Sequence, residues 1–414
     1  MYEDIPDLKL PDKSQARGSK DYVSLINNDV ELVQKYLPGL RRNQLTSSLE
    51  YNGSDGRTKV LQGNDLDTMT TKFVVEFSVY IPKDRMTSAV QYAADQNCYC
   101  PIKNYLNRCQ KEIGPHPKWN CIGKEFLGND SPTATQAIQR LMIGAVNRAF
   151  NPGASMQWLP ILVGAQGVGK SMFARNLVPQ DLFAEITTPL DKLTTEPNRL
   201  HVAWIIELPE IDAYFQVRNI ENFKNLVTTR VDETRLAYDR LPSKLARRFV
   251  LIGTTNRNQF LVDSTGNRRF VPIEIGNGFR IPWKQLIDER DSLWSAAVRD
   301  WKAGDSYEFT SGEIAELSEY IQEFGDPDPW QHKISEFVDH RQEVKVSEIL
   351  EHGLQLDYKQ QGRKESRRVT EVMQSLGWRR INTTRDGKSV RLWKRTTPLP
   401  TLEKENTENS SFDF

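Results

Sequence analysis

The stretch LVGAQGVGKSMFARNLVP, residues 162–179, decides the fold. It contains a complete G-x-x-x-x-G-K-S pattern that runs from Gly164 to Ser171. An apolar segment, WLPILVG, precedes the pattern and an amphipathic segment follows it. This strand–loop–helix order is the context in which such a pattern binds phosphate. The stretch therefore predicts an α/β P-loop NTPase core.

Each part of this pattern suits a nucleotide phosphate. Glycines let backbone N–H groups converge on phosphate oxygens without Cβ clashes, and a helix that begins at Lys170 points its positive end at the same anion. Lys170 would contact the β and γ phosphates, and the Ser171 hydroxyl would bind Mg²⁺. The residues expected to bind ATP are Gly164, Gln166, Gly167, Val168, Gly169, Lys170, Ser171 and Met172.

Three more apolar segments predict further strands of a covered parallel sheet: HVAWIIEL (201–208), RRFVLIGTTN (247–256) and RRFVPIEI (268–275). The first reaches Glu207, which is expected to bind Mg²⁺, and Glu210 follows three residues later. Either glutamate could be the catalytic base. Asn256, at the end of the next strand, could orient the attacking water. These polar residues could also be solvated strand ends or loop caps.

The pair Arg268-Arg269 follows a Gly-Asn turn. Two arginines at this place could reach the nucleotide of a neighbouring subunit and stabilise the charge of the transition state. The alternative is a pair of surface salt bridges.

Length and composition set limits on the rest. The chain has 414 residues, enough for two or three domains, with 27% charged and 38% hydrophobic residues. Its formal net charge is zero, so any nucleic-acid contact requires a local basic patch. No apolar run is long enough to span a membrane and the first residues lack a signal sequence, so we expect a cytoplasmic protein. The spacing of Cys98, Cys100, Cys109 and Cys121 is unlike that of zinc sites, which favours reduced cysteines.

Composition also predicts the domain order. Residues 1–22 and the acidic tail 397–414 are polar and are expected to be disordered. Residues 23–150 are expected to be mostly helical, with a strand-like segment at Phe73–Ile81, and residues 151–330 form the ATPase core. Residues 331–396 have the order helix, helix, hairpin, which predicts a winged helix. That module is basic and could bind duplex DNA or dock a protein, and its Trp378 and Trp393 favour a core position.

The segments GAQGVGKS, WIIELPEI, FKNLVTTRVDETRLAYDR, LIGTTN and FLVDSTGNRRFVPIEI, in this order, resemble the virulence-associated protein E (VapE, or VirE) family. The resemblance implies an AAA+-like, superfamily 3-type DNA helicase of prophages and plasmids, which forms a hexameric ring on DNA during replication. Relatives are often fused to a primase, but the stretch before the phosphate loop here resembles the family's own upstream region, so we expect a helicase whose partners could include a separate primase or other replication proteins. The resemblance assigns Lys170 and Ser171 to the phosphate loop, Glu207 to the acidic strand end, Asn256 to the sensor, and Arg268 and Arg269 to the finger. One departure is Leu208, where the superfamily often has a second acid.

The resemblance also implies a DNA-gripping hairpin between the acidic strand and the sensor strand, at residues 227–248. The residues expected to bind DNA there are Arg230, Arg240, Lys244 and Arg247. A solvated charged hairpin is the alternative. Two other functions stay open: an ATP-dependent initiator or switch that binds DNA without unwinding it, and a small-molecule kinase. The late position of the phosphate loop and the basic C-terminal region count against the kinase.

Overall fold

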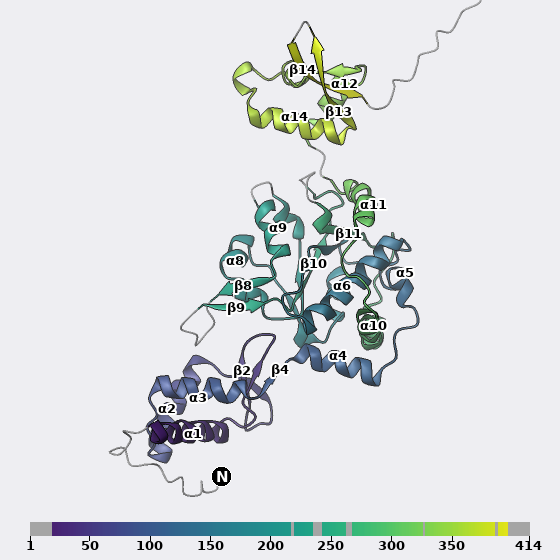
Figure 1. The fold of residues 1–414 in the computed structure, drawn as a ribbon. Helices are drawn as coiled ribbons and strands as arrows, with labels where there is room; N and C mark the ends of the chain where they lie inside the picture. Colours follow the sequence, from purple (N-terminus) through teal and green to yellow (C-terminus); the bar gives the residue numbers. More distant parts are fainter. Residues whose placement is uncertain are drawn as a thin grey trace, which may run out of the picture. The chain divides into compact units, whose positions relative to one another are not determined.

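The computed structural model describes residues 19–216, 219–234, 242–261, 267–325, 328–385 and 388–395 (Figure 1). The chain divides into two compact units. The first contains the described residues up to 258 together with 267–321, and the second contains 259–261 and the described residues from 322 onward. In this part of the chain no helix has the length and apolar character needed to cross a membrane.

The N-terminal part of the first unit combines three helices with a small sheet of order β3-β2-β1-β4. Strand β1 is antiparallel to β2 and parallel to β4. We expected helices here but not this sheet, because strands of two to four residues are too short for alternation to be visible. The elements are α1 (Ser19–Tyr36), β1 (Arg41–Asn43), β2 (Leu49–Asn52), β3 (Thr58–Val60), α2 (Gly63–Phe77), α3 (Lys83–Asp95) and β4 (Cys98–Tyr99).

Two expectations for this region need correction. Helix α1 begins at Ser19, inside the segment 1–22 that we expected to be disordered, while residues 1–18 lie outside the described part. The segment 73–81, expected to be strand-like, is helical up to Phe77. Leu66, Met69 and Phe73 are buried at the spacing of one helix face. Their packing outweighs the β propensity of the two valines that follow Phe73.

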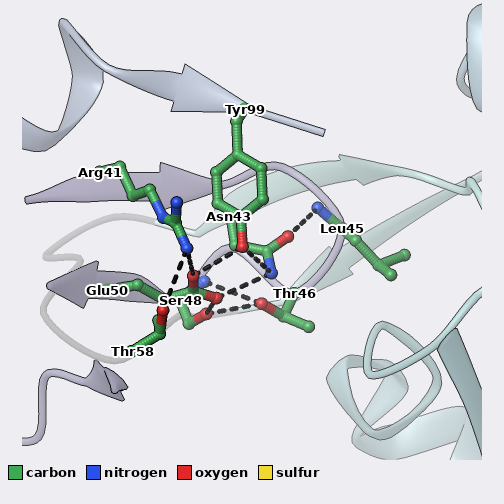
Figure 2. Close-up of polar contacts among 8 residues, drawn as sticks. All are labelled: Arg41, Asn43, Leu45, Thr46, Ser48, Glu50, Thr58 and Tyr99. Atoms are coloured by element: carbon green, nitrogen blue, oxygen red, sulfur yellow. Dashed lines mark hydrogen bonds and ion pairs between the residues drawn. The ribbon is translucent and has the colours of Figure 1, made fainter. Parts of the chain in front are cut away.

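A buried carboxylate, that of Glu50, joins three strands of the small sheet (Figure 2). The Asn43 amide donates to Glu50 Oε1 at 2.8 Å, and the Tyr99 hydroxyl donates to Oε2 at 2.6 Å. The Arg41 guanidinium lies 3.4 Å from the same carboxylate and 4.2 Å from the centroid of the Tyr99 ring. Burial and the contact with Glu50 raise the pKa of Tyr99 to about 12. The network thus fixes β1, β2 and β4 to one another.

The rest of the first unit is a mixed α/β core around five parallel strands, in the order β11-β5-β10-β7-β6. Every residue of β5, β7 and β10 is buried, which agrees with the continuous apolar runs of the sequence. The predicted parallel sheet is therefore confirmed. The edge strand β6 was not expected, because it has only three residues.

The helices of this core are α4 (Pro101–Glu112), α5 (Ile122–Leu127), α6 (Pro132–Phe150), α7 (Lys170–Asn176), α8 (Leu190–Thr195), α9 (Ile220–Thr228), α10 (Trp283–Ala303) and α11 (Ser311–Gln322). Short 3₁₀ turns are η1 (Trp119–Cys121), η2 (Gln180–Leu182), η3 (Pro197–Leu200), η4 (Ile211–Phe215) and η5 (Asn267–Arg269). The strands are β5 (Leu159–Val163), β6 (Phe183–Glu185), β7 (Ile205–Leu208), β10 (Val250–Thr255) and β11 (Phe270–Glu274), with a separate hairpin of β8 (Val231–Thr234) and β9 (Ser243–Ala246).

The second unit has its own hydrophobic core and a three-stranded sheet of order β12-β14-β13. Trp378 and Trp393 are buried in that core, as the sequence predicted. Within the part expected to have the order helix, helix, hairpin, residues 344–356 are the first predicted helix, and the structure has a short α-helix there that continues as a π-helical turn. The turn of the predicted hairpin, at 386–387, lies outside the described residues, as does the tail from 396 onward. The elements are α12 (Gln331–Val338), β12 (Glu343–Val344), α13 (Val346–Glu348), η6 (Ile349–Gly353), η7 (Tyr358–Gln360), α14 (Arg363–Ser375), β13 (Trp378–Arg385) and β14 (Lys388–Arg395).

Candidate nucleotide-binding site

The glycine-rich loop connects the end of β5 to the start of α7, at the carboxyl edge of the parallel sheet. Gly167 and Gly169 have φ angles of 82° and 101°, in the left-handed region that favours glycine. A Cβ on Gly169 would also lie 3.2 Å from Ile281. Residues 165–167 are exposed, so the loop presents its backbone to solvent. Glycine is thus required here by backbone geometry.

The Lys170 side chain is buried beneath this loop. Its ammonium donates to the carbonyl oxygens of Gly164 at 2.7 Å and Ala165 at 2.8 Å, and to Asn256 Oδ1 at 2.8 Å. Burial lowers the pKa of Lys170, and the charge of Glu207 opposes that shift. Lys170 and Asn256 were both singled out from the sequence, and the structure brings them into direct contact.

The Glu207 carboxylate lies at the end of β7 and is completely buried. Its Oε1 accepts hydrogen bonds from the hydroxyls of Ser171 at 2.6 Å and Thr254 at 2.8 Å. Its Oε2 is buried and has no hydrogen-bond partner among the described residues. Burial raises the pKa of Glu207, the two hydroxyl bonds lower it, and nearby Glu185 raises it further. A buried carboxylate oxygen without a partner is costly, and it fits the position of a cation ligand.

The last two residues of β10 and the residue that follows them contact three different elements. Thr254 bonds to Glu207, Thr255 donates to Asp212 Oδ1 at 3.0 Å, and Asn256 accepts from Lys170. Because side chains alternate along a strand, Thr254 and Asn256 share one face of the sheet and Thr255 lies on the other. Of these three residues, only Asn256 was expected from the sequence to belong to the site. The alternation of polar side chains in TTN was the signal that could have found both threonines.

Asp212 links the segment after β7 to the residue after Asn256. Its Oδ1 accepts the bond from Thr255, and its Oδ2 lies 3.2 Å from Arg257 Nε. The backbone N–H of Arg257 donates to Thr255 Oγ1 at 3.1 Å. Glu210, two residues before Asp212, is exposed and has a left-handed φ of 47°. The structure therefore brings Asp212, rather than Glu210, into contact with the end of β10.

The two candidate finger residues differ in exposure. Both belong to the short turn η5, which leads into the edge strand β11. Arg268 is exposed, whereas Arg269 is half-buried and its Nε is fully covered. The exposed side chain of Arg268 is the more accessible to another molecule.

The hairpin residues proposed for DNA contact fall into three groups. Arg230 and Lys244 are exposed, although Arg230 Nε donates to the Gly153 carbonyl at 2.7 Å. Arg240 lies outside the described residues. Arg247 contradicts our expectation, because only 3% of its side chain is exposed and it bonds to both oxygens of Asp232 at 2.7 Å. The Arg247 guanidinium is therefore paired with Asp232 inside the fold and is not exposed for DNA.

His201 completes this buried cluster, with Nε2 2.8 Å from Asp232 Oδ2. Burial raises the pKa of Asp232, but the bonds and charges of His201 and Arg247 lower it below its usual value. The cluster therefore contains an ionised Asp232 carboxylate. It joins β8, which carries Asp232, to the turn η3, which contacts β8 and is followed directly by His201. In the described part of the chain, this cluster included, no three His, Cys, Asp or Glu side chains are grouped as a metal site would require.

The parallel sheet and the loop between β5 and α7 define a mixed α/β protein with a glycine-rich loop at the carboxyl edge of its sheet. The family model of the virulence-associated protein E-like domain matches residues 107–325, more than half of the chain. The chain belongs to this family.

Other comparisons give more distant matches. No curated protein matches the chain. An apo structure of the NrS-1 C-terminal region is 12% identical with a TM-score of 0.49, over 89% of this chain and 98% of that one. A second apo structure of that region, in its A form, is 11% identical with a TM-score of 0.47, over 88% and 98% of the two chains.

Proposed function

We propose that this chain is an Mg²⁺-dependent ATP hydrolase that moves along DNA, a helicase or translocase of a replicating mobile element. The observation that carries the proposal is the meeting of Lys170, Ser171, Glu207 and Asn256 at one edge of the sheet. A lysine, a hydroxyl, a buried carboxylate and an amide are the groups that phosphoryl transfer to water employs in P-loop enzymes. They come from α7, β7 and the residue after β10. The convergence of these separate elements on one place supports a functional site.

The residues of this site have separate roles in the proposed reaction. Lys170 exchanges its carbonyl acceptors for the β and γ phosphates of ATP, while the exposed backbone of the loop surrounds them. Ser171 and Glu207 would hold Mg²⁺, which supplies charge stabilisation to the phosphates. The unpartnered Oε2 of Glu207 fits this role. Asn256 orients the attacking water, and Glu207 or Glu210 accepts its proton.

The proposal extends to a ring, hexameric as in the helicases that the sequence resembles. In such a ring Arg268 or Arg269 acts on the ATP of the neighbouring subunit, where an arginine of this kind contributes about 10³–10⁵ in rate. Support comes from the exposure of Arg268 beside an edge strand of the sheet. A separate primase would supply the primers that such a helicase needs.

Single-stranded DNA is the proposed track. The exposed cations of the β8–β9 hairpin, Arg230 and Lys244, would contact phosphates without sequence preference. Arg240 belongs to the same prediction. Arg247 does not, because Asp232 occupies its guanidinium.

A second candidate function is an ATP-dependent initiator or switch that binds DNA without unwinding it. The exposed cations gathered on α14, β13 and β14 of the separate second unit favour it. Strand displacement on a forked duplex, with sizing of the protein in ATP, distinguishes the two functions. A helicase gives ring-sized oligomers and displacement that Lys170→Ala abolishes and the exposed-lysine control Lys192→Ala leaves intact. ATP turnover without displacement in any DNA geometry would contradict the helicase and favour the switch.

A further inference from the structure

The second unit has an element order that the ATP site does not explain. Its elements run helix, strand, helix, helix, strand, strand, namely α12, β12, α13 with its π turn, α14, β13 and β14. The first strand pairs antiparallel with the last, with Val344 opposite Trp393. In Figure 1 helix α14 lies along one side of this unit, and β13 and β14 form a long hairpin. This is the order of a winged helix-turn-helix, in which the second helix of the motif is free to enter a groove.

Helix α14 has one buried side and one charged side. Val369, Val372 and Met373 pack into the core of the unit. Arg363, Lys364 and Arg367 are exposed and lie in the first two turns. The charged side therefore begins where the helix begins.

The basic residues of α14 are used in different ways. Arg368 donates to both oxygens of Asp328, at 2.7 and 2.9 Å, and lies 4.1 Å from the Trp330 ring, so it holds the unit together. Arg367 contacts Glu371 at 3.0 Å along the exposed side. Arg363 and Lys364 make no ion pair recorded among the described residues. Folding of the unit accounts for Arg368 but not for these other cations.

The position of these cations is unfavourable for the isolated helix. The first turn of a helix carries a partial positive charge, which disfavours the cations Arg363 and Lys364 there, whereas Glu365 is the acidic residue of that turn. Further exposed cations follow on the hairpin that α14 precedes: Arg379, Arg380, Arg391 and Lys394. An anionic partner with many charges would offset this repulsion. A helix of 13 residues that is basic at its start fits the major groove of B-DNA, where the N-terminal residues of such helices contact base edges.

We propose that α14 and the described parts of strands β13 and β14 bind duplex DNA, with Arg363, Lys364 and Arg367 at the groove. This surface lies in a different unit from the ATP site, so the proposal goes beyond ATP hydrolysis and single-strand tracking. It gives the chain a second nucleic-acid site with a different preferred substrate. The chain could then hold duplex DNA through one unit while the other acts on a single strand.

The test measures binding of a labelled short duplex to the full chain without nucleotide, across a range of salt concentrations. The double variant Arg363→Ala, Arg367→Ala is compared with Lys333→Ala, Lys359→Ala, which removes two exposed cations from other parts of the same unit. We expect the first variant to lose about tenfold or more in duplex affinity and to lower the salt slope by about two. The control variant keeps the affinity of the parent chain.

Three results would overturn the proposal: no duplex binding by the parent chain, equal losses in both variants, or an α14 variant that binds duplex normally. Binding of polyglutamate, and of one strand of the same DNA, is measured on the same variants. Loss of polyglutamate binding with duplex binding retained would assign the surface to an acidic protein instead. ATP hydrolysis without DNA is measured in parallel, so a failure of the ATPase proposal is seen separately.

Discussion

Ser171 Oγ donates a 2.6 Å hydrogen bond to Oε1 of Glu207, while Oε2 of the same carboxylate is buried and has no partner among the described residues. Ser171 belongs to α7, which follows β5 and the glycine-rich loop, and Glu207 belongs to β7. Strands β5 and β7 are not neighbours in the sheet, because β10 lies between them. Thr254 of β10 donates to Oε1 as well. This arrangement leaves one carboxylate oxygen for a cation beside the hydroxyl that would share it.

Glu207→Gln is expected to abolish ATP hydrolysis while ATP binding is retained. The amide cannot serve as a base and is a poorer Mg²⁺ ligand, so turnover should fall by about 10²-fold or more. Turnover and nucleotide binding by fluorescence anisotropy are measured on the same preparation. Glu196→Gln, an exposed carboxylate on the surface, is the control and should keep full activity. Retention of turnover by Glu207→Gln would remove Glu207 from the mechanism.

The same variant has an expected effect on stability. Burial raises the pKa of Glu207 above its usual value, so the Glu207 carboxyl group binds its proton more tightly in the folded state than in the unfolded state. The stability that this group contributes is therefore full below the ordinary glutamate pKa and is lost as pH rises through the folded pKa. Without ligands, Glu207→Gln should melt at a higher temperature than the parent chain at neutral pH, and the difference should shrink near pH 4. A lower melting temperature at neutral pH would contradict this account.

Arg268→Ala and Arg269→Ala should both keep ATP binding, and the one that carries the finger should lose about 10³-fold or more in turnover. If the arginine acts on the ATP of a neighbouring subunit, two inactive variants should restore activity when they are mixed in one ring. Lys170→Ala supplies an intact finger with a dead site, and the finger variant supplies an intact site. Their mixture should hydrolyse ATP faster than the sum of the two alone. Additive rates after subunit exchange would mean that neither arginine acts on a neighbour.

Arg247→Ala should destabilise the first unit, because it leaves the buried Asp232 carboxylate without its main partner. Breaking a buried ion pair of this kind costs about 3–5 kcal/mol. Lys244→Ala, on the same hairpin but exposed, should change stability by less than about 0.5 kcal/mol and should weaken binding of single-stranded DNA. Urea unfolding measures the first effect and a DNA titration the second. The opposite assignment of the two effects would restore Arg247 as a DNA contact.

Asp212→Asn is expected to lower kcat for ATP with little change in KM. Asp212 joins the segment after β7 to Thr255 and Arg257 on either side of Asn256, so its loss should misplace the sensor rather than the phosphate loop. Steady-state kinetics separate the two parameters. A large rise in KM with kcat unchanged would mean that Asp212 supports nucleotide binding and not the sensor.

The parallel sheet could be predicted because its strands carry long apolar runs, and because the phosphate-loop pattern requires a loop and a helix after the first of these strands. The meeting of Lys170 with Asn256 agrees with that topology, since strand ends of one parallel sheet share an edge. The small N-terminal sheet could not be predicted, because its short strands depend on a polar network around Glu50 that joins distant residues.

The position of charges was the least predictable feature. Arg247 has the same basic side chain as Arg230, and only the fold shows that Asp232, itself bonded to His201, binds the Arg247 guanidinium. Similarly, Arg368 and Arg367 are adjacent in sequence, yet one packs on Trp330 and the other is exposed. A one-residue step along a helix turns a side chain by about 100°, so charge alone does not separate a structural arginine from a binding one.

The most direct test of the central claim is ATP hydrolysis by the full chain with Mg²⁺, with and without single-stranded DNA, for the parent and for Lys170→Ala. We predict turnover that single-stranded DNA stimulates several-fold and that the substitution abolishes in both conditions. Turnover that is insensitive to Lys170→Ala, or a parent chain that hydrolyses no ATP with or without DNA, would contradict the assignment of this site.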